Sequence, residues 1–173
     1  MALQYSSGKT GGVRTRAEAE ALYEKAANQT DDPATAIHAM MNLGAMANES
    51  NPPDKELAVE WHSKAVKVGE RVLREDEMPA QQRIKVEQVL SHARYFLTDY
   101  QHMLATQYFE AGDTRWMALM TTLARQTDHV ANATSAMVYL GRHATQSGDK
   151  PKEALEWLVR AIEDGQSELL KET

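Results

Sequence analysis

The chain has 173 residues, of which 42% are hydrophobic, so it is long enough to bury a core and is not expected to be disordered. Its formal net charge is −6 and its basic residues are scattered, which argues against binding to DNA or RNA, because phosphate neutralisation needs a dense basic surface. It has no cysteine, which excludes disulfides, thiolate zinc ligands and a cysteine nucleophile.

Residues 1–14 are polar and glycine-rich, and we expect them to form a flexible N-terminal tail. The stretch lacks the apolar segment of a signal peptide, and no run of the chain approaches the length of a membrane span. We therefore expect a cytoplasmic protein without a membrane partner, and these observations also fit a periplasmic protein.

A row of helices is predicted after the tail. Residues 15–18, TRAE, have the spacing of a capping box, which predicts a helix to about Asn28. Residues 32–33, Asp-Pro, have the types of an N-cap and a first-turn proline, and they predict the start of a second helix. Its apolar residues recur at steps of three and four, and the sequence NPPD at 51–54 ends it.

The middle of the chain continues this pattern. A third helix carries apolar residues from 57 to 68 and ends near Gly69 or at the acidic residues 75–77. Pro79 opens a long helical run that ends at the Gly-Asp pair 112–113. The run is either one long helix or two helices joined by a kink, and we favour one because no Pro or Gly interrupts it.

Three more helices complete the prediction. Asp113 can cap a short one, residues 128–129 start the next, and Pro151 starts the last, which either passes Gly165 or stops there. The sequence therefore predicts an all-α chain.

Two segments, residues 39–65 and 136–161, resemble each other. Both carry Leu-Gly followed by Ala-x-Glu-Trp and, four residues after the Trp, another Ala. Gly44 and Gly141 fall inside the predicted helices, where glycine costs about 1 kcal/mol relative to alanine, so we expect a packed helix to approach closely there. Short helix pairs of this kind cannot bury their apolar stripes alone and must stack on a neighbour.

These motifs are similar to the Sel1-like repeat, a branch of the tetratricopeptide (TPR) superfamily. Residues 19–27 match the second half of a unit, and residues 99–127 look more like a degenerate tetratricopeptide repeat. The resemblance implies a right-handed α–α superhelix of about three helix pairs plus a leading helix, as a single repeat domain over residues 15–173. It also implies a non-enzymatic scaffold that binds a protein or peptide, such as a bacterial adaptor, chaperone or immunity-type partner.

The predicted binding surface is a stripe on the first helix of each pair, opposite the leucine that packs on the second helix. In tetratricopeptide-like solenoids this stripe lines the concave groove. Its members here are His38, Met41, Ala45 and Asn48; then Asp99, His102, Thr106 and Phe109; and finally Ser135, Val138, Arg142 and Thr145. In the alternative interpretation, about half of these residues pack on neighbouring helices or face solvent.

Signals of other chemistry lack the context that they need. Residues 8–10, Gly-Lys-Thr, match the end of a phosphate loop, but residue 3 is not glycine and no strand precedes it. Asp99 and His102 share a helix face, for which an ordinary hydrogen bond is the preferred interpretation over a metal site. No nucleophile motif is present. We therefore predict no catalytic residue, cofactor or metal.

Self-assembly is the alternative function. The last predicted helix has apolar residues at 155, 158, 159, 162, 169 and 170, whereas a terminal capping helix should be polar on its outer face. Such a helix would pair with its copy in a homodimer. A remote alternative is an enzyme on a helical-repeat scaffold, which requires a deep pocket with convergent titratable groups.

Overall fold

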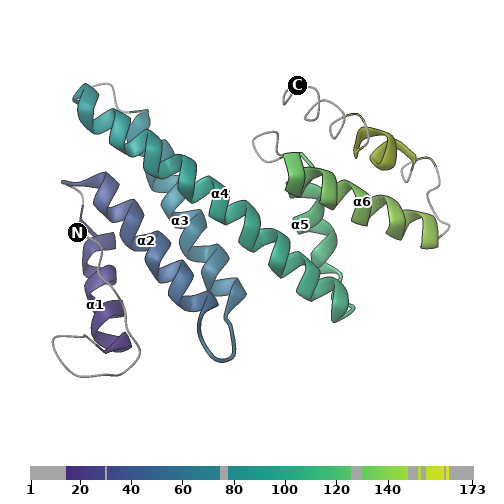
Figure 1. The fold of residues 1–173 in the computed structure, drawn as a ribbon, viewed down its shortest axis with the longest axis horizontal. Helices are drawn as coiled ribbons and strands as arrows, with labels where there is room; N and C mark the ends of the chain where they lie inside the picture. The colour runs from purple at the N-terminus through teal and green to yellow at the C-terminus, as the bar shows by residue number, and fades with distance from the viewer. Residues whose placement is uncertain are drawn as a thin grey trace. The chain divides into compact units, whose positions relative to one another are not determined.

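The computed structural model describes residues 15–29, 31–74, 78–125, 130–147, 152, 155–161 and 163. All regular structure in these residues is helical (Figure 1), so the predicted all-α class is confirmed. None of the helices in these ranges has the length and hydrophobicity needed to cross a membrane. The predicted tail at residues 1–14 and the predicted helix boundaries at Pro151 and Gly165 lie outside the described residues.

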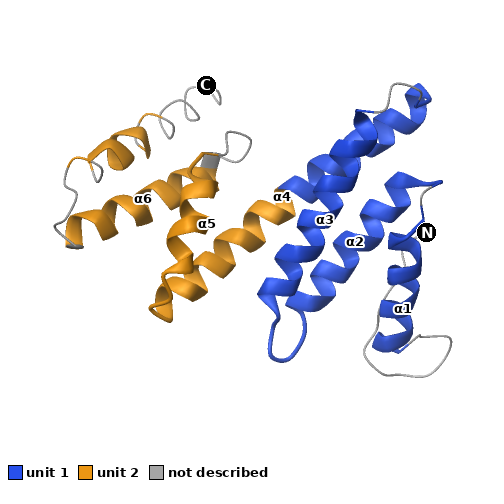
Figure 2. Ribbon diagram, turned by 180° about the vertical axis from the view of Figure 1, so that it is seen from behind, with its two compact units in different colours: residues 1–94 blue, residues 95–173 orange. Residues whose placement is uncertain are grey.

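The chain divides into two compact units, residues 1–94 and residues 95–173 (Figure 2). The predicted single domain over residues 15–173 stays a prediction. Unit 1 contains α1 (Arg16–Ala27), α2 (Pro33–Asn48), α3 (Lys55–Leu73) and the first part of α4 (Ala80–Glu110). Unit 2 contains the second part of α4, α5 (Arg115–Leu123), α6 (Val130–Ser147) and the helical residues 155–161.

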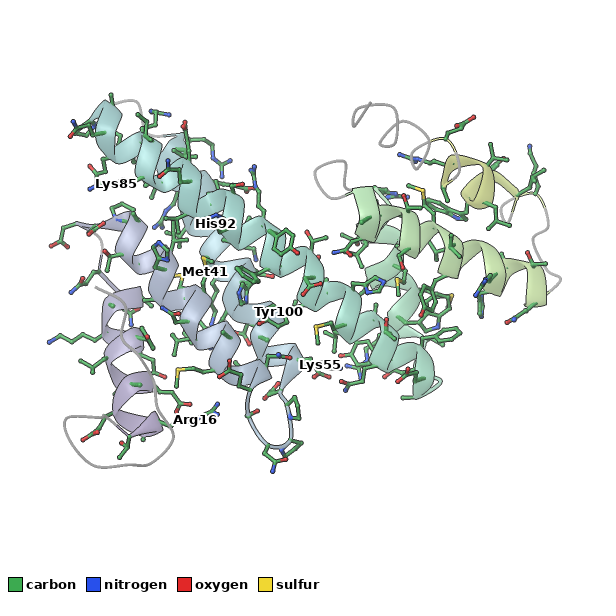
Figure 3. All side chains as sticks on the ribbon, in the orientation of Figure 1. Arg16, Met41, Lys55, Lys85, His92 and Tyr100 are labelled. Atoms are coloured by element: carbon green, nitrogen blue, oxygen red, sulfur yellow. The ribbon has the colours of Figure 1, made fainter. Side chains whose placement is uncertain are left out.

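The core of unit 1 is built from all four of its helices. Ile37 and Leu43 of α2 are 0% and 5% exposed, and they belong to one apolar cluster with Val72 of α3 and Val86 of α4. Met41 packs against this cluster from α2 (Figure 3). Each helix therefore buries one apolar stripe against its neighbours, as the helical spacing of these residues predicts.

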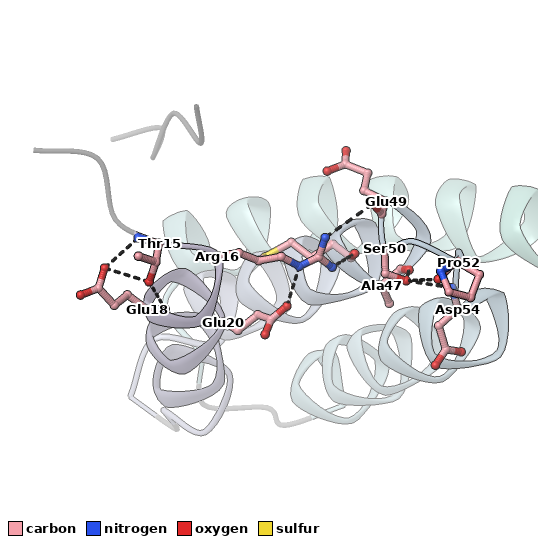
Figure 4. Close-up of polar contacts among 10 residues, drawn as sticks. Thr15, Arg16, Glu18, Glu20, Ala47, Glu49, Ser50, Pro52 and Asp54 are labelled. Atoms are coloured by element: carbon pink, nitrogen blue, oxygen red, sulfur yellow. Dashed lines mark hydrogen bonds and ion pairs between the residues drawn. The ribbon is translucent and has the colours of Figure 1, made fainter. Parts of the chain in front are cut away.

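Side-chain caps fix the starts of the first helices. The Thr15 hydroxyl accepts from the backbone N–H of Glu18 and the Glu18 carboxylate accepts from that of Thr15, so the predicted capping box is confirmed (Figure 4). Asp32 caps α2 as predicted, and hydrogen bonds from the Thr35 hydroxyl and backbone N–H hold the pKa of Asp32 below its ordinary value. Asp54 caps α3 in the same way.

An arginine of α1 holds the C-terminal end of α2. The Arg16 guanidinium donates to the carbonyl oxygens of Met46 and Glu49 and pairs with Glu20 on its own helix (Figure 4). Carbonyls at a helix C-terminus have no partner within the helix, and a basic side chain can satisfy them. Arg16 therefore ties the leading helix to α2 by polar contacts as well as by apolar packing.

The predicted close approach at Gly44 is confirmed. A Cβ at this position would lie 2.2 Å from Nδ1 and 2.3 Å from Cε1 of the His62 ring, which belongs to α3. His62 is 1% exposed. Its Nδ1 lies 2.9 Å from the carbonyl oxygen of Ala58, and we assign the proton to Nδ1 so that the ring donates to this carbonyl. The glycine thus makes room for a buried histidine ring, whereas the sequence alone indicated only a packed helix.

Of the two ends predicted for α3, the later one is supported, because the helix passes Gly69 and ends at Leu73. Gly69 is buried, and a Cβ there would lie 2.9 Å from Cδ1 of Leu90 on α4. Residues 75–77 lie outside the described part of the chain. Gly69 therefore serves packing between α3 and α4 rather than termination of α3.

The stability of unit 1 is expected to fall in mild acid through His62. Burial lowers the pKa of His62 below its ordinary value of 6.5, although the Ala58 hydrogen bond opposes the shift. The unfolded chain therefore binds this proton at a higher pH than the folded chain does. The free energy of unfolding should be unaffected by this group above pH 6.5 and should decrease as the pH falls from there towards the lowered pKa.

Urea denaturation at about pH 7 and about pH 5 measures this decrease. His62→Gln should reduce the difference between the two conditions, because it removes the titrating group. An equal pH dependence in the parent chain and in His62→Gln would contradict the assignment.

The long α4, which belongs to both units, is one unbroken helix, as favoured from the sequence, and it ends before Gly112. Gly112 has φ 69°, the left-handed conformation that favours glycine after a helix. The predicted cap Asp113 accepts from the backbone N–H of Arg115 at 2.9 Å, but the N-cap position of α5 is Thr114. The side chain of Thr114 makes no capping bond, so the predicted Asp113 supplies it from the residue before the N-cap position.

Candidate functional site

The exposed face of α2 carries no charged side chain. The helix sequence PATAIHAMMNLGAMAN contains no Asp, Glu, Lys or Arg, and its exposed residues are Thr35, His38 and Asn42. The neighbouring α3 differs, because it exposes Glu56, Glu60, Lys64, Lys67 and Arg71. Depletion of charge is typical of the centre of protein interfaces rather than of an ordinary solvated helix face.

Only part of the predicted stripe on α2 is on this face. His38 is exposed, whereas Met41 and Ala45 are half-buried. Asn48 is also half-buried, and its Oδ1 has no hydrogen-bond partner among the described residues. Asn42 was not part of the predicted stripe. It is exposed and lies one helical turn after His38 on the same face. The accessible stripe is therefore rotated from the predicted one, towards His38 and Asn42.

In unit 2, two of the predicted stripes meet. Nε2 of His102 on α4 lies 3.0 Å from Oγ of Ser135 on α6, and the His102 ring contacts Tyr139 edge to face at 6.2 Å between centroids. Burial lowers the pKa of His102, while the nearby charge of Asp99 opposes the shift. His102 is therefore held as a neutral, hydrogen-bonded ring between the two helices at neutral pH.

Five aromatic rings form a continuous edge-to-face series in unit 2. Beyond His102 and Tyr139, the Tyr139 ring lies 5.6 Å from Phe109, Phe109 lies 5.1 Å from Trp116, and Trp116 lies 4.9 Å from His143. Trp116 is 4% exposed, whereas Phe109 is 38% exposed. Edge-to-face pairs stabilise such packing beyond the burial of area. Phe109 is thus a partly exposed ring that packs on the buried Trp116.

The remaining predicted residues of unit 2 have separate environments. The hydroxyl groups of Thr106 and Thr145 donate to carbonyls of their own helices, to His102 at 3.0 Å and to Gly141 at 2.8 Å. Val138 is half-buried, and Arg142 is exposed. Asp99 is half-buried, and its charge acts on His102 without a hydrogen bond between the two side chains.

His102 and Ser135 are as close as a catalytic base and its nucleophile, but the backbone N–H groups that would stabilise an oxyanion are not available beside them. Ser135 lies inside α6, where the backbone N–H groups are bonded to carbonyls four residues earlier and cannot also stabilise an oxyanion. In the part of the chain that is described, no three His, Cys, Asp or Glu side chains are placed to hold a metal ion.

A family model for the Sel1 repeat matches residues 1–31, 37–69 and 134–166. The second and third segments contain the two Leu-Gly units, and the first contains the half-unit at residues 19–27. Residues 99–127, which look like a degenerate tetratricopeptide repeat, are not matched by this model. Searches of curated proteins and of solved structures gave no significant match.

Proposed function

The chain belongs to the Sel1 repeat family, and we propose that it is a non-catalytic module that binds a protein or peptide partner on the face of α2. Sel1 repeats generally mediate protein–protein interaction. A role as adaptor, chaperone or immunity-type partner follows from the family resemblance, and a cytoplasmic location follows from the sequence features given above; both belong to the same proposal.

The charge-free face of α2 carries the proposal. A partner that docks there displaces water from the imidazole of His38 and the amide of Asn42, and from no carboxylate, ammonium or guanidinium group of the helix. Neither side chain is hydrogen-bonded to another described residue, so both can bond to a peptide backbone. Desolvating neutral groups that then regain hydrogen bonds costs far less than desolvating charges.

Selection of binders from a displayed random-peptide library tests the proposal on the intact chain. We expect His38→Glu to weaken the selected peptides at least about tenfold, because it places an unpaired carboxylate under the bound partner. The matched control is Ala21→Glu, which adds the same charge at an exposed position of α1 and should leave binding unchanged.

The two possible failures of this experiment are distinct. Equal binding by the parent chain, His38→Glu and Ala21→Glu would place the site elsewhere than on α2. A library that yields no binder to the parent chain would reject the binding function itself.

Self-association is a second candidate, which the C-terminal helical residues favour. Leu155 is 63% exposed and Val159 is 42% exposed, and the two lie one helical turn apart in unit 2. Exposed apolar side chains gathered on one helix face are typical of an interaction surface. Sedimentation velocity over a range of concentrations tests this candidate, and a strict monomer would remove it.

A further inference from the structure

Three aromatic side chains lie together on the surface of α4 in unit 2. Tyr95 is 52% exposed and Phe96 is 39% exposed. Tyr100, which is labelled in Figure 3, is half-buried. The rings of Tyr95 and Phe96 meet edge to face at 5.5 Å, and those of Phe96 and Tyr100 are stacked at 6.5 Å. We name Tyr95, Phe96 and Tyr100 the aromatic cluster. Exposed aromatic groups gathered in this way mark interaction sites.

A carboxylate lies beside the aromatic cluster. Asp99 follows Tyr95 by four residues and Phe96 by three, so its side chain is on the helix face that both rings share. Asp99 forms no ion pair with any residue that the structure describes. The nearest arginine in sequence, Arg94, is bound to Glu70 of α3 at 3.0 Å. The surface therefore combines partly exposed aromatic side chains with a negative charge.

Elsewhere in unit 2, an aromatic ring and a carboxylate together bind a guanidinium group. The guanidinium carbon of Arg115 lies 4.0 Å from the centre of the Tyr108 ring. Nε and a terminal nitrogen of the same group donate to Oδ2 of Asp113 at 2.9 and 2.6 Å, and these bonds lower the pKa of Asp113. A ring and a carboxylate from this chain thus already bind one guanidinium group, by stacking and by hydrogen bonds together.

We propose that the aromatic cluster and Asp99 form a receptor for an arginine side chain of the partner. The planar guanidinium can stack on a ring face while it donates to the carboxylate, which the tetrahedral ammonium group of lysine cannot reproduce. The net charge of −6 also attracts a basic segment over longer distances. This inference rests on the proposed function, because it names the side chain by which a protein partner is recognised.

Fluorescence anisotropy with a labelled peptide of alternating glycine and arginine tests the receptor on the intact chain. We expect Asp99→Asn and Tyr95→Leu each to weaken binding at least about tenfold, the size expected for loss of a charged hydrogen bond or a stacked cation. Glu110→Gln is the matched control, because it removes the same charge from an exposed position of the same helix and should change binding less than about twofold.

Two further peptides define the chemistry. Citrulline in place of arginine keeps the shape and removes the charge, and it should abolish binding, whereas lysine should bind more weakly than arginine. Equal losses in Asp99→Asn and Glu110→Gln would show general charge attraction and overturn the receptor. Circular dichroism of each variant verifies that the helices are retained, and the two receptor variants test the carboxylate and the ring separately.

The outcome also separates this inference from the proposed function. If the parent chain binds peptides selected from the random library but not the arginine peptide, the receptor is rejected and the binding function stands. If it binds neither, both are rejected.

Discussion

Replacing Gly44 with alanine is expected to lower the free energy of unfolding by about 2 kcal/mol or more, despite the better helix propensity of alanine. The added Cβ would lie 2.2 Å from Nδ1 of His62, far inside van der Waals contact. The ring is almost completely buried and its Nδ1 is bound to the carbonyl of Ala58, so it cannot move aside without losing that bond or displacing α3. Urea denaturation followed by circular dichroism measures the loss.

A double variant identifies the cause. His62→Ala removes the ring, so Gly44→Ala should cost less stability in that background than in the parent chain. The loss in the double variant should therefore be smaller than the sum of the two single losses. Gly112→Ala is the control, because a Cβ there contacts nothing within 4 Å and only its φ of 69° is unfavourable to alanine. Additive effects of Gly44→Ala and His62→Ala would show that the ring does not limit this position.

Replacing Trp116 with alanine is expected to lower the free energy of unfolding of unit 2 by about 3 to 5 kcal/mol. The indole is 4% exposed and contacts the rings of Phe109 and His143, so its removal leaves a cavity in the aromatic series. Trp116→Phe keeps a ring at this position and should cost markedly less. Urea denaturation followed by circular dichroism measures both variants, since tryptophan fluorescence would also report Trp61 and Trp157.

The outcome of the Trp116 substitutions tests the packing of unit 2. Equal stabilities of the parent chain and Trp116→Ala would contradict the role of the indole as the centre of this packing. A loss in Trp116→Phe as large as that in Trp116→Ala would show that the shape of the indole, and not ring contact in general, is required.

Local signals in the sequence predicted most of the helix boundaries. The capping box at residues 15–18 and the Asp-Pro pair at 32–33 act within one helical turn, so they can be recognised without knowledge of the fold. The long α4 followed from the absence of Pro and Gly. Contacts between distant residues could not be predicted in this way, because the reach of Arg16 to Met46 depends on how α1 packs on α2.

The candidate site was predicted only in part, for a similar reason. The stripe on α2 was placed by assuming that Leu43 points at the second helix of its pair, but α2 also buries Met40 and Ala47 in unit 1. The true exposed line therefore includes Asn42 and leaves Ala45 half-buried. In unit 2, the sequence placed His102 and Ser135 on the predicted stripes of two different repeats, and their contact required the packing of α4 against α6.

The absence of charge on α2 has a consequence for the choice of buffer in any binding study. Dissolved ions screen attraction between charged groups, but they have little effect on contacts between neutral groups. Adhesion to the α2 face should therefore persist at high ionic strength, whereas capture of a guanidinium by Asp99 should weaken. A titration with sodium chloride would thus show which of the two proposed surfaces binds a given partner.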